Sequence, residues 1–104
     1  MATTVQLGSG RFKYEVSAKW ETVPDGYQWR EVAGVITDAN DNVYVFNRGP
    51  HPMIVFDKDG NFVKSWGEDI FVNPHGASSG PDDTLYLTDD GDHILARTPE
   101  GRRA

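Results

Sequence analysis

The sequence predicts an all-β fold, and three observations lead to this prediction. Short runs of apolar and β-branched residues recur at regular spacing along most of the chain. Clusters rich in aspartate, asparagine, glycine and proline separate these runs, and such residues favour turns. No segment shows the apolar periodicity and the capping residues of a helix. Many short strands joined by tight turns are typical of all-β proteins.

The N-terminal part of the chain divides into a lead-in and one candidate strand. Residues 1–10 show no periodic apolar pattern and are interpreted as a lead-in. In residues 11–30, apolar and polar side chains first alternate and then give way to a turn at 24–26, which reads Pro-Asp-Gly. The alternation places one apolar face on a strand from 12 to 20, formed by Phe12, Tyr14, Val16, Ala18 and Trp20.

Six further short runs have the composition of β-strands. They are rich in valine, isoleucine, leucine, tyrosine and phenylalanine, and turn residues lie between them. The predicted strands are 32–37, 43–46, 53–56, 62–66, 85–88 and 94–97. The predicted turns are 38–42, 47–50, 57–60, 81–83 and 99–101.

Composition sets limits on size and chemistry. The 104 residues are 38% hydrophobic and 25% charged, which is enough apolar material for one domain with a packed core. There is no cysteine, so any metal must be held by histidine, carboxylate, backbone carbonyl or water. Cysteine usage therefore gives no indication of the compartment.

The charge balance argues against two classes of partner. The net charge is −6, and the only cluster of basic residues is Arg102-Arg103, so neither nucleic acid nor an anionic membrane is expected as the main partner. No apolar run approaches the roughly 20 residues of a membrane span, and residues 1–4 do not begin a signal peptide. We therefore expect a soluble protein.

An internal repeat is the most informative feature of the sequence. Shifting the chain by 42 positions gives five identities in one register, which are Gly34/Gly76, Asp41/Asp83, Tyr44/Tyr86, Gly49/Gly91 and His51/His93. Beyond this point the second copy is one residue shorter, so that Gly60 corresponds to Gly101. A repeat of roughly 40–45 residues made of four short strands has the size of one β-propeller blade.

The repeated segments resemble a known family. Residues 34–46 and 55–67 form a pattern similar to the NHL repeat, and residues 82–89 and 91–93 carry it in the second copy. Within that superfamily, the sequences Val-Phe-Asn-Arg-Gly (45–49) and Asn-Pro-His-Gly (73–76) most resemble the peptidyl-α-hydroxyglycine α-amidating lyase domain and its bacterial relatives. The resemblance covers about residues 31–101 and implies blades of a six-bladed propeller.

Only two blades fit into this chain, at 31–67 and 68–104. Two blades leave two apolar faces uncovered, so the sequence is either part of a longer protein or assembles with copies of itself. The second blade is expected to lack its outer strand, and the strand predicted in 11–30 could complete that blade in a neighbouring chain. Three chains would then form a six-bladed ring, so a homotrimer is predicted.

The resemblance also implies site residues. The histidine that matches His75 is a zinc ligand in the lyase family, and a threefold ring would bring three copies of His75 together. The arginine that matches Arg48 is catalytic there, and backbone carbonyls that match Val35 and Ala77 bind a structural calcium ion. The alternatives are a channel histidine that contacts only water, and a structural ion pair between Arg48 and a neighbouring turn carboxylate.

Other polar and aromatic residues are expected to be structural. His51 and His93 occupy equivalent loop positions and should bond their own turns, the turn aspartates should bond nearby backbone N–H groups, and Trp20, Trp29 and Trp66 should pack the blades. The family's catalytic tyrosine and its other zinc ligands lie in blades that this chain lacks, and none of the four tyrosines here matches that tyrosine.

Three interpretations of function follow from the sequence. The resemblance implies a zinc-dependent lyase that acts on a small peptide-like carbinolamide. The alternatives are a non-enzymatic NHL propeller module that binds a peptide or protein partner, and an inactive propeller fragment.

Overall fold

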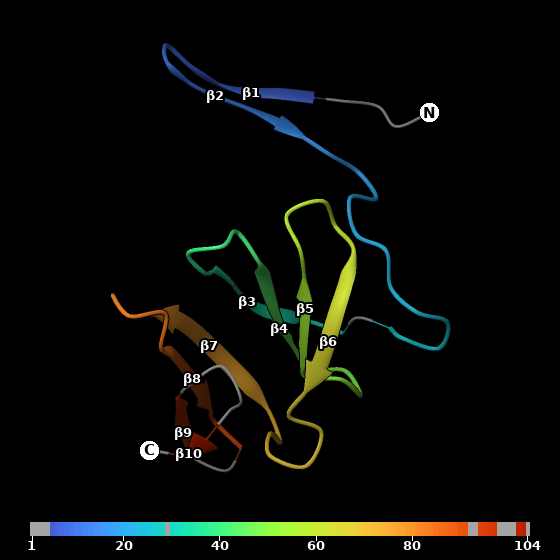
Figure 1. Cartoon of the computed structure of the whole chain (residues 1–104), viewed down its shortest axis with the longest axis vertical. Coiled ribbons are helices and arrows are strands. Elements are labelled where there is room, and N and C mark those ends of the chain that lie inside the picture. Colours follow the sequence, from blue (N-terminus) through green and yellow to red (C-terminus); the bar gives the residue numbers. More distant parts are fainter. Residues whose placement is uncertain (1–4, 29, 92–93, 98–101, 104) are drawn as a thin grey trace.

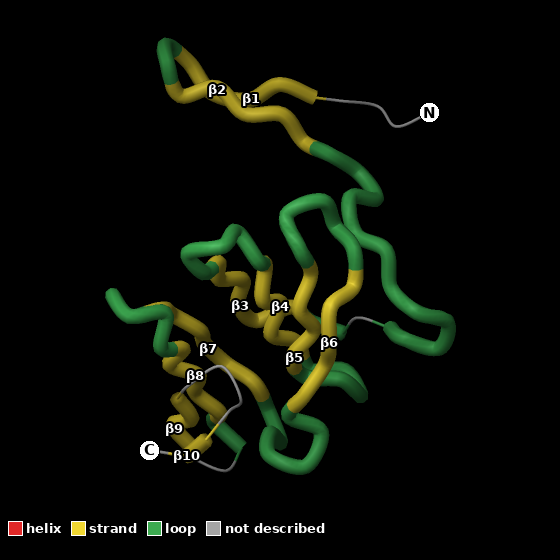
Figure 2. Tube along the Cα trace, viewed as in Figure 1, coloured by secondary structure: helices red, strands yellow, loops and turns green. Residues whose placement is uncertain are grey.

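The computed structural model describes residues 5–28, 30–91, 94–97 and 102–103 of the chain. All the secondary structure in these ranges is β-strand, arranged in one sheet of two strands and two sheets of four, and every pair of neighbouring strands is antiparallel (Figures 1 and 2). The predicted all-β class is therefore confirmed. Within these ranges both large sheets are open and no closed propeller is formed. No helix in the described part is able to cross a membrane.

The first four-stranded sheet contains strands that follow one another in sequence. These strands are β3 (Val32–Thr37), β4 (Val43–Asn47), β5 (Met53–Phe56) and β6 (Phe62–Trp66), and they pair in that order. Tight turns are possible because Asp41 (φ 63°) and Gly60 (φ 86°) adopt left-handed backbone conformations. The bounds predicted from the sequence agree with these strands to within one residue.

The second four-stranded sheet repeats this arrangement. It contains β7 (Pro74–Ser79), β8 (Leu85–Asp89), β9 (Ile94–Arg97) and β10 (Arg102–Arg103) in sequence order. The expectation that this blade lacks its outer strand was wrong, because β10 pairs with β9 through Arg102↔Arg97 and Arg103↔Ala96. The outer strand is nevertheless two residues long, whereas β6 has five.

The N-terminal segment forms a separate hairpin, so residues 5–9 are not an irregular lead-in. Strand β1 (Val5–Ser9) pairs with β2 (Phe12–Val16), and the hairpin projects away from the two larger sheets (Figure 1). The strand predicted for 12–20 ends at Val16, since the chain then turns and Lys19 takes a positive φ of 58°. Within this chain β2 pairs with β1, and the edge of the second sheet is taken by β10.

The core lies between the two four-stranded sheets. One face of the first sheet packs against Leu85 and Leu87 of β8, with Ala77 of β7 at the margin. That covered face consists of Ile36, Tyr44, Phe46, Met53 and Val55. Each large apolar side chain buried here contributes roughly 1.5–3 kcal/mol to folding, so this interface is the main source of stability between the repeats.

The opposite face of the first sheet is only partly covered. Trp20 lies edge-on to Phe56, with ring centroids 5.7 Å apart, and Val23 and Tyr27 pack beside it. Toward β3 the cover ends, and Val35 remains 57% exposed. We call this face, formed by Val35, Val43, Val45, Ile54 and Phe56, the open face.

The strand register confirms the repeat found in the sequence. The pairing of β7 with β8 reproduces that of β3 with β4 at a constant shift of 42 residues, including the irregularity at Val32/Gly34 and Pro74/Gly76. Asp41 and Asp83 also take the same positive φ, at 63° and 62°. The two sheets are therefore two copies of one structural unit.

The turn between β3 and β4 makes the stability of the first sheet sensitive to acid. Partial burial alone would raise the pKa of Asp38, but hydrogen bonds from Asn42, Asn40 and Tyr44 outweigh it and lower the pKa below 3.8. A carboxyl group with a depressed pKa in the folded state stabilises the protein above its unfolded pKa. That contribution is lost as the pH falls through the folded value.

We therefore expect Asp38→Asn to flatten the decline in unfolding free energy between about pH 5 and pH 2. Urea unfolding followed by tryptophan fluorescence at several pH values measures this. Asp25→Asn, in an exposed turn, controls for the loss of one negative charge. Equal slopes in the Asp38 variant and the parent would contradict the assignment.

Candidate functional site

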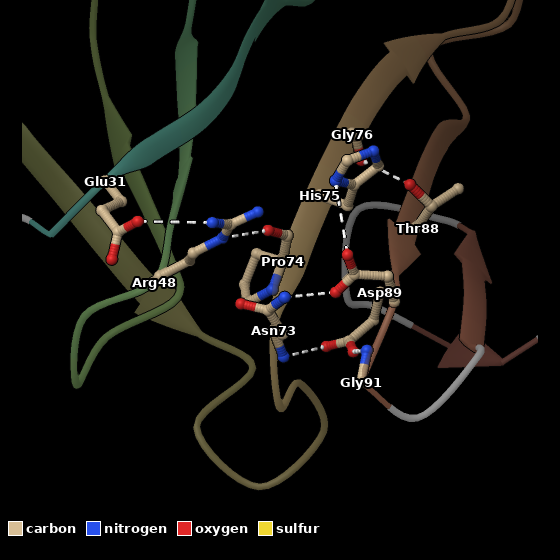
Figure 3. Close-up of polar contacts among 10 residues, drawn as sticks. Glu31, Arg48, Asn73, Pro74, His75, Gly76, Thr88, Asp89 and Gly91 are labelled. Carbon is tan, nitrogen blue, oxygen red and sulfur yellow. Dashed lines mark hydrogen bonds and ion pairs between the residues drawn. The ribbon is translucent and has the colours of Figure 1, made fainter.

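The two residues singled out by the sequence, Arg48 and His75, lie at the junction of the two repeats. Arg48 follows β4, and His75 is the second residue of β7. The backbone N–H of Arg48 donates to the carbonyl of Arg30 at 2.7 Å, which fixes the loop against the segment before β3. Figure 3 shows that the side chain of Arg48 extends toward the beginning of β7.

Arg48 bridges the two sheets through its guanidinium group. Its Nε donates to the carbonyl of Pro74 at 2.8 Å, and its Nη1 lies 3.3 Å from Glu31 Oε2 (Figure 3). The ion pair considered from the sequence is therefore present, although its partner precedes β3 and does not lie in a turn. The side chain is 29% exposed, so its remaining N–H groups can reach an anion arriving from solvent.

His75 is exposed and has a carboxylate beside one ring nitrogen. Its Nδ1 lies 3.7 Å from Asp90 Oδ2, and its side chain is 64% exposed. A metal-binding histidine commonly turns one nitrogen toward a carboxylate and offers the other to the metal. The carboxylate of Asp90 lies on the Nδ1 side of the His75 ring but beyond hydrogen-bond distance, so the arrangement resembles that of a zinc ligand only in the direction of the carboxylate.

The described residues of one chain do not complete a metal site. No three histidine, aspartate or glutamate side chains among them lie close enough to share an ion. A metal on His75 would therefore take further ligands from other copies, from solvent, or from residues outside the described ranges.

The positions expected to offer carbonyls to calcium are equivalent in the two repeats. Val35 pairs with Val45, and Ala77 pairs with Leu87. Strands β3 and β7 lie side by side, since a Cβ built on Gly34 would come within 2.9 Å of the Ala77 Cβ. The two backbone positions thus occur on the neighbouring first strands of their sheets, as the repeat implies.

Two buried polar residues support the junction, and neither was expected from the sequence to have this role. Asn47 accepts hydrogen bonds from the backbone N–H groups of Gly49 and Arg30, at 2.8 Å and 3.4 Å. At the equivalent position, Asp89 accepts from Val72, Asn73 and Gly91, at distances of 2.6, 2.8 and 2.8 Å. The signal was an asparagine or aspartate two residues before a glycine in both repeats.

Each repeat also has a polar pair next to its buried Asn47 or Asp89. Glu31 pairs with Arg48 in the first copy, and Asn73 donates to Asp90 in the second. Asp90 therefore contacts Asn73 and lies near His75. The first pair joins a cation to an anion, whereas the second joins a neutral amide to an anion, so equivalent positions of the two repeats differ in charge.

His51 contacts residues outside its own turn. Its Nδ1 lies 2.9 Å from Glu68 Oε2, and its ring stacks on Tyr27 with centroids 3.9 Å apart. Burial alone would raise the pKa of Glu68, but the hydrogen bonds from His51 and Ser65 outweigh it and lower the pKa. The expectation that His51 would bond its own turn was therefore wrong for the side chain, whereas its carbonyl does accept from Asn47 Nδ2 at 2.9 Å.

The remaining candidates are structural or lie outside the described residues. Tyr44 donates to Asp38 at 3.0 Å, in keeping with a packing role. Trp20 and Trp66 pack against Phe56 and Phe71. Trp29 and His93 lie outside the residues that the structure describes.

No protein-family model, no curated protein and no solved structure matches this chain.

Proposed function

We propose that three copies of this chain form a six-bladed NHL-type propeller. We further propose that the ring acts as a zinc-dependent lyase on a small peptide-like carbinolamide. One observation carries the catalytic part of the proposal, namely that Arg48 is bonded to the backbone immediately before His75, at 2.8 Å from the Pro74 carbonyl. Residues far apart in sequence, and both singled out by the family resemblance, thus meet at one junction.

The architecture supports the ring. Each four-stranded sheet is an antiparallel meander of consecutive strands, which is the construction of a propeller blade. The two sheets pack face to face through equivalent strands. Further sheets could add to either side in the same manner, and three chains of two sheets would close a six-bladed ring.

Each residue at the junction would have a different role in the reaction. His75 would hold the metal, with Asp90 on its Nδ1 side orienting the ring. Bound zinc would supply a Lewis acid and a water molecule with a lowered pKa. Arg48 would hold the carboxylate or the developing oxyanion of the substrate through N–H groups not used by Pro74 and Glu31. The carbonyls of Val35 and Ala77 in each copy would offer oxygen ligands to calcium.

A non-enzymatic propeller module is the second candidate. The described residues contain no group of three histidine, aspartate or glutamate side chains that could share a metal ion, and Arg48 is paired with Glu31. These contacts would suit a ring that presents one face to a peptide or protein partner and carries no catalytic centre. The two candidates differ in whether metal is bound in a fixed ratio.

Native mass spectrometry of the purified chain tests the proposal. We expect a trimer that binds about one zinc ion per three chains, and we expect His75→Ala to lose the zinc while remaining trimeric. His51→Ala serves as the matched histidine control, because the His51 ring stacks on Tyr27 and lies beside Glu68, whereas the His75 ring faces Asp90. A metal-free trimer would favour the binding module, and a monomer would contradict the ring.

Arg48→Ala tests the catalytic assignment. With α-hydroxyglycine peptides as substrate, we expect it to lower kcat/KM by about 10²–10³-fold, as loss of an oxyanion-stabilising donor does. Zinc content should remain unchanged. Arg48→Lys should recover little of the activity, because an ammonium group cannot replace two parallel N–H donors. Full activity in Arg48→Ala would overturn the role.

A further inference from the structure

The open face of the first sheet contains an apolar groove. Its hollow measures about 630 Å³ and is bounded on one side by Trp20 and Glu21. Val35 and Val32 are 57% and 50% exposed there. The rest of the groove is formed by Val43, Val45 and Phe56. A face of this kind on one side of a sheet favours a packing partner over water.

The repeat indicates what covers this groove. Val35, Val43 and Val45 stand at the positions that correspond, 42 residues later, to Ala77, Leu85 and Leu87. Those three residues are the surface that the second sheet packs against the first within the chain. The chain therefore carries the same packing surface twice, once buried in the core and once open.

The complementary surface also occurs twice. Within the chain, the residues that cover the second sheet include Gly34, Ile36, Tyr44 and Phe46. Their equivalents in the second sheet are Gly76, Ser78, Tyr86 and Thr88. Ser78, Tyr86 and Thr88 are exposed, so one chain presents both an uncovered groove and an uncovered copy of the surface that fits it.

A glycine marks the point of closest approach. Gly34 has no room for a side chain, because a Cβ there would lie 2.9 Å from the Cβ of Ala77 on β7. Gly76 is its equivalent and is not in the left-handed region. Within the described residues, the only atom that a Cβ on Gly76 would approach is the Thr88 hydroxyl, at 3.0 Å. Gly34 faces Ala77 within the chain, and Gly76 is open on the corresponding side. Because Val35 is the equivalent of Ala77 in the first repeat, Gly76 is suited to face Val35.

We propose that the open face of the first sheet binds the exposed face of the second sheet of another copy. The register is that of the two sheets within one chain, with Gly76 of one copy against Val35 of the next. This inference rests on the proposed ring but requires neither zinc nor lyase activity. The contact joins two different surfaces, so it is head-to-tail and leads from chain to chain around a ring.

Engineered cysteines test the register, and the natural chain has none to interfere. We expect the double variant Val35→Cys/Gly76→Cys to form disulfide-linked chains, with a cyclic trimer as the limit, under mild oxidation. Neither single variant should cross-link, because a head-to-tail contact does not bring a residue against its own copy. The pair Val63→Cys/Gly76→Cys is the control, since Val63 is 50% exposed but lies on β6 outside the groove.

A charge in the groove provides a second readout that does not depend on cysteine geometry. Val35→Glu should weaken association by at least about 100-fold, because the interface would bury an unpaired carboxylate. Val63→Glu, at a similarly exposed valine, should leave the assembly mass unchanged in light scattering. Circular dichroism of both variants is the control that tests whether the sheets remain folded.

The possible results separate this inference from the function proposed above. Cross-linking of Val35→Cys alone would mean a two-fold dimer through the grooves and would overturn the inference. A trimer without the Val35–Gly76 cross-link would overturn this register while leaving a ring in place. A monomer would overturn both. Specific cross-linking in a trimer that binds no zinc would support the interface. It would contradict the proposed zinc-dependent activity.

Discussion

Asp89→Ala is expected to destabilise the second sheet by about 3–5 kcal/mol, because three backbone N–H groups would lose a charged acceptor at roughly 1–3 kcal/mol each. The carboxylate is 3% exposed and accepts hydrogen bonds from three backbone N–H groups, two before β7 and one after β8. Alanine would leave these three partly buried donors without their acceptor. Urea unfolding followed by circular dichroism measures the loss.

Asp89→Asn is the informative control. The first repeat already has asparagine at the equivalent position, where Asn47 accepts from Gly49 and donates to the carbonyls of His51 and Pro52. We therefore expect Asp89→Asn to lose less than half as much stability as Asp89→Ala. If the two variants were equally unstable, the negative charge and not the hydrogen-bonding geometry would be what holds this loop.

Phe46→Ala is expected to cost about 3–5 kcal/mol, as is usual for removal of a fully buried aromatic side chain. The ring has no exposed surface and meets Phe71 edge-to-face, with centroids 4.8 Å apart. Phe46 lies in the apolar layer between the two sheets, so the cavity left by alanine would weaken the packing of one repeat against the other.

Phe12→Ala is the matched control for this substitution. Phe12 lies on the projecting hairpin and is 60% exposed. In the isolated chain its loss should change the unfolding free energy by no more than about 0.5 kcal/mol. Urea unfolding of both variants at the same protein concentration measures this difference. An equal loss of unfolding free energy in the two variants would contradict the assignment of the core to the interface between the sheets.

The strands of the first sheet could be predicted from local sequence, whereas three others could not. Strand β7 has the sequence Pro-His-Gly-Ala-Ser-Ser, which contains no β-branched or aromatic residue, so only the repeat indicates it. Strand β10 consists of two arginines, and its pairing depends on β9. Strand β1 was not predicted, because the alternation of Val5 and Leu7 with Gln6 and Gly8 is too short to distinguish a strand from an irregular segment.

The candidate site shows a similar division. Arg48 and His75 could be named from motifs, but their surroundings depend on tertiary packing. Arg48 binds the carbonyl of Pro74, and every residue has a carbonyl, so no sequence pattern marks this contact. The ion pair with Glu31 likewise depends on the loop after β4 returning to the segment before β3. Packing of the two sheets, and not local preference, thus creates the junction.

The meander order of both large sheets also determines how the chain acquires its structure. Every strand pairs with its neighbour in sequence, so each sheet can form from contacts that close only short loops. The contacts between β3 and β7, such as Gly34 against Ala77, come from much further apart. We expect the sheets to form early and their docking to be the slow step. Ribosomal synthesis would then release the first sheet in a folded state before its packing partner has been made.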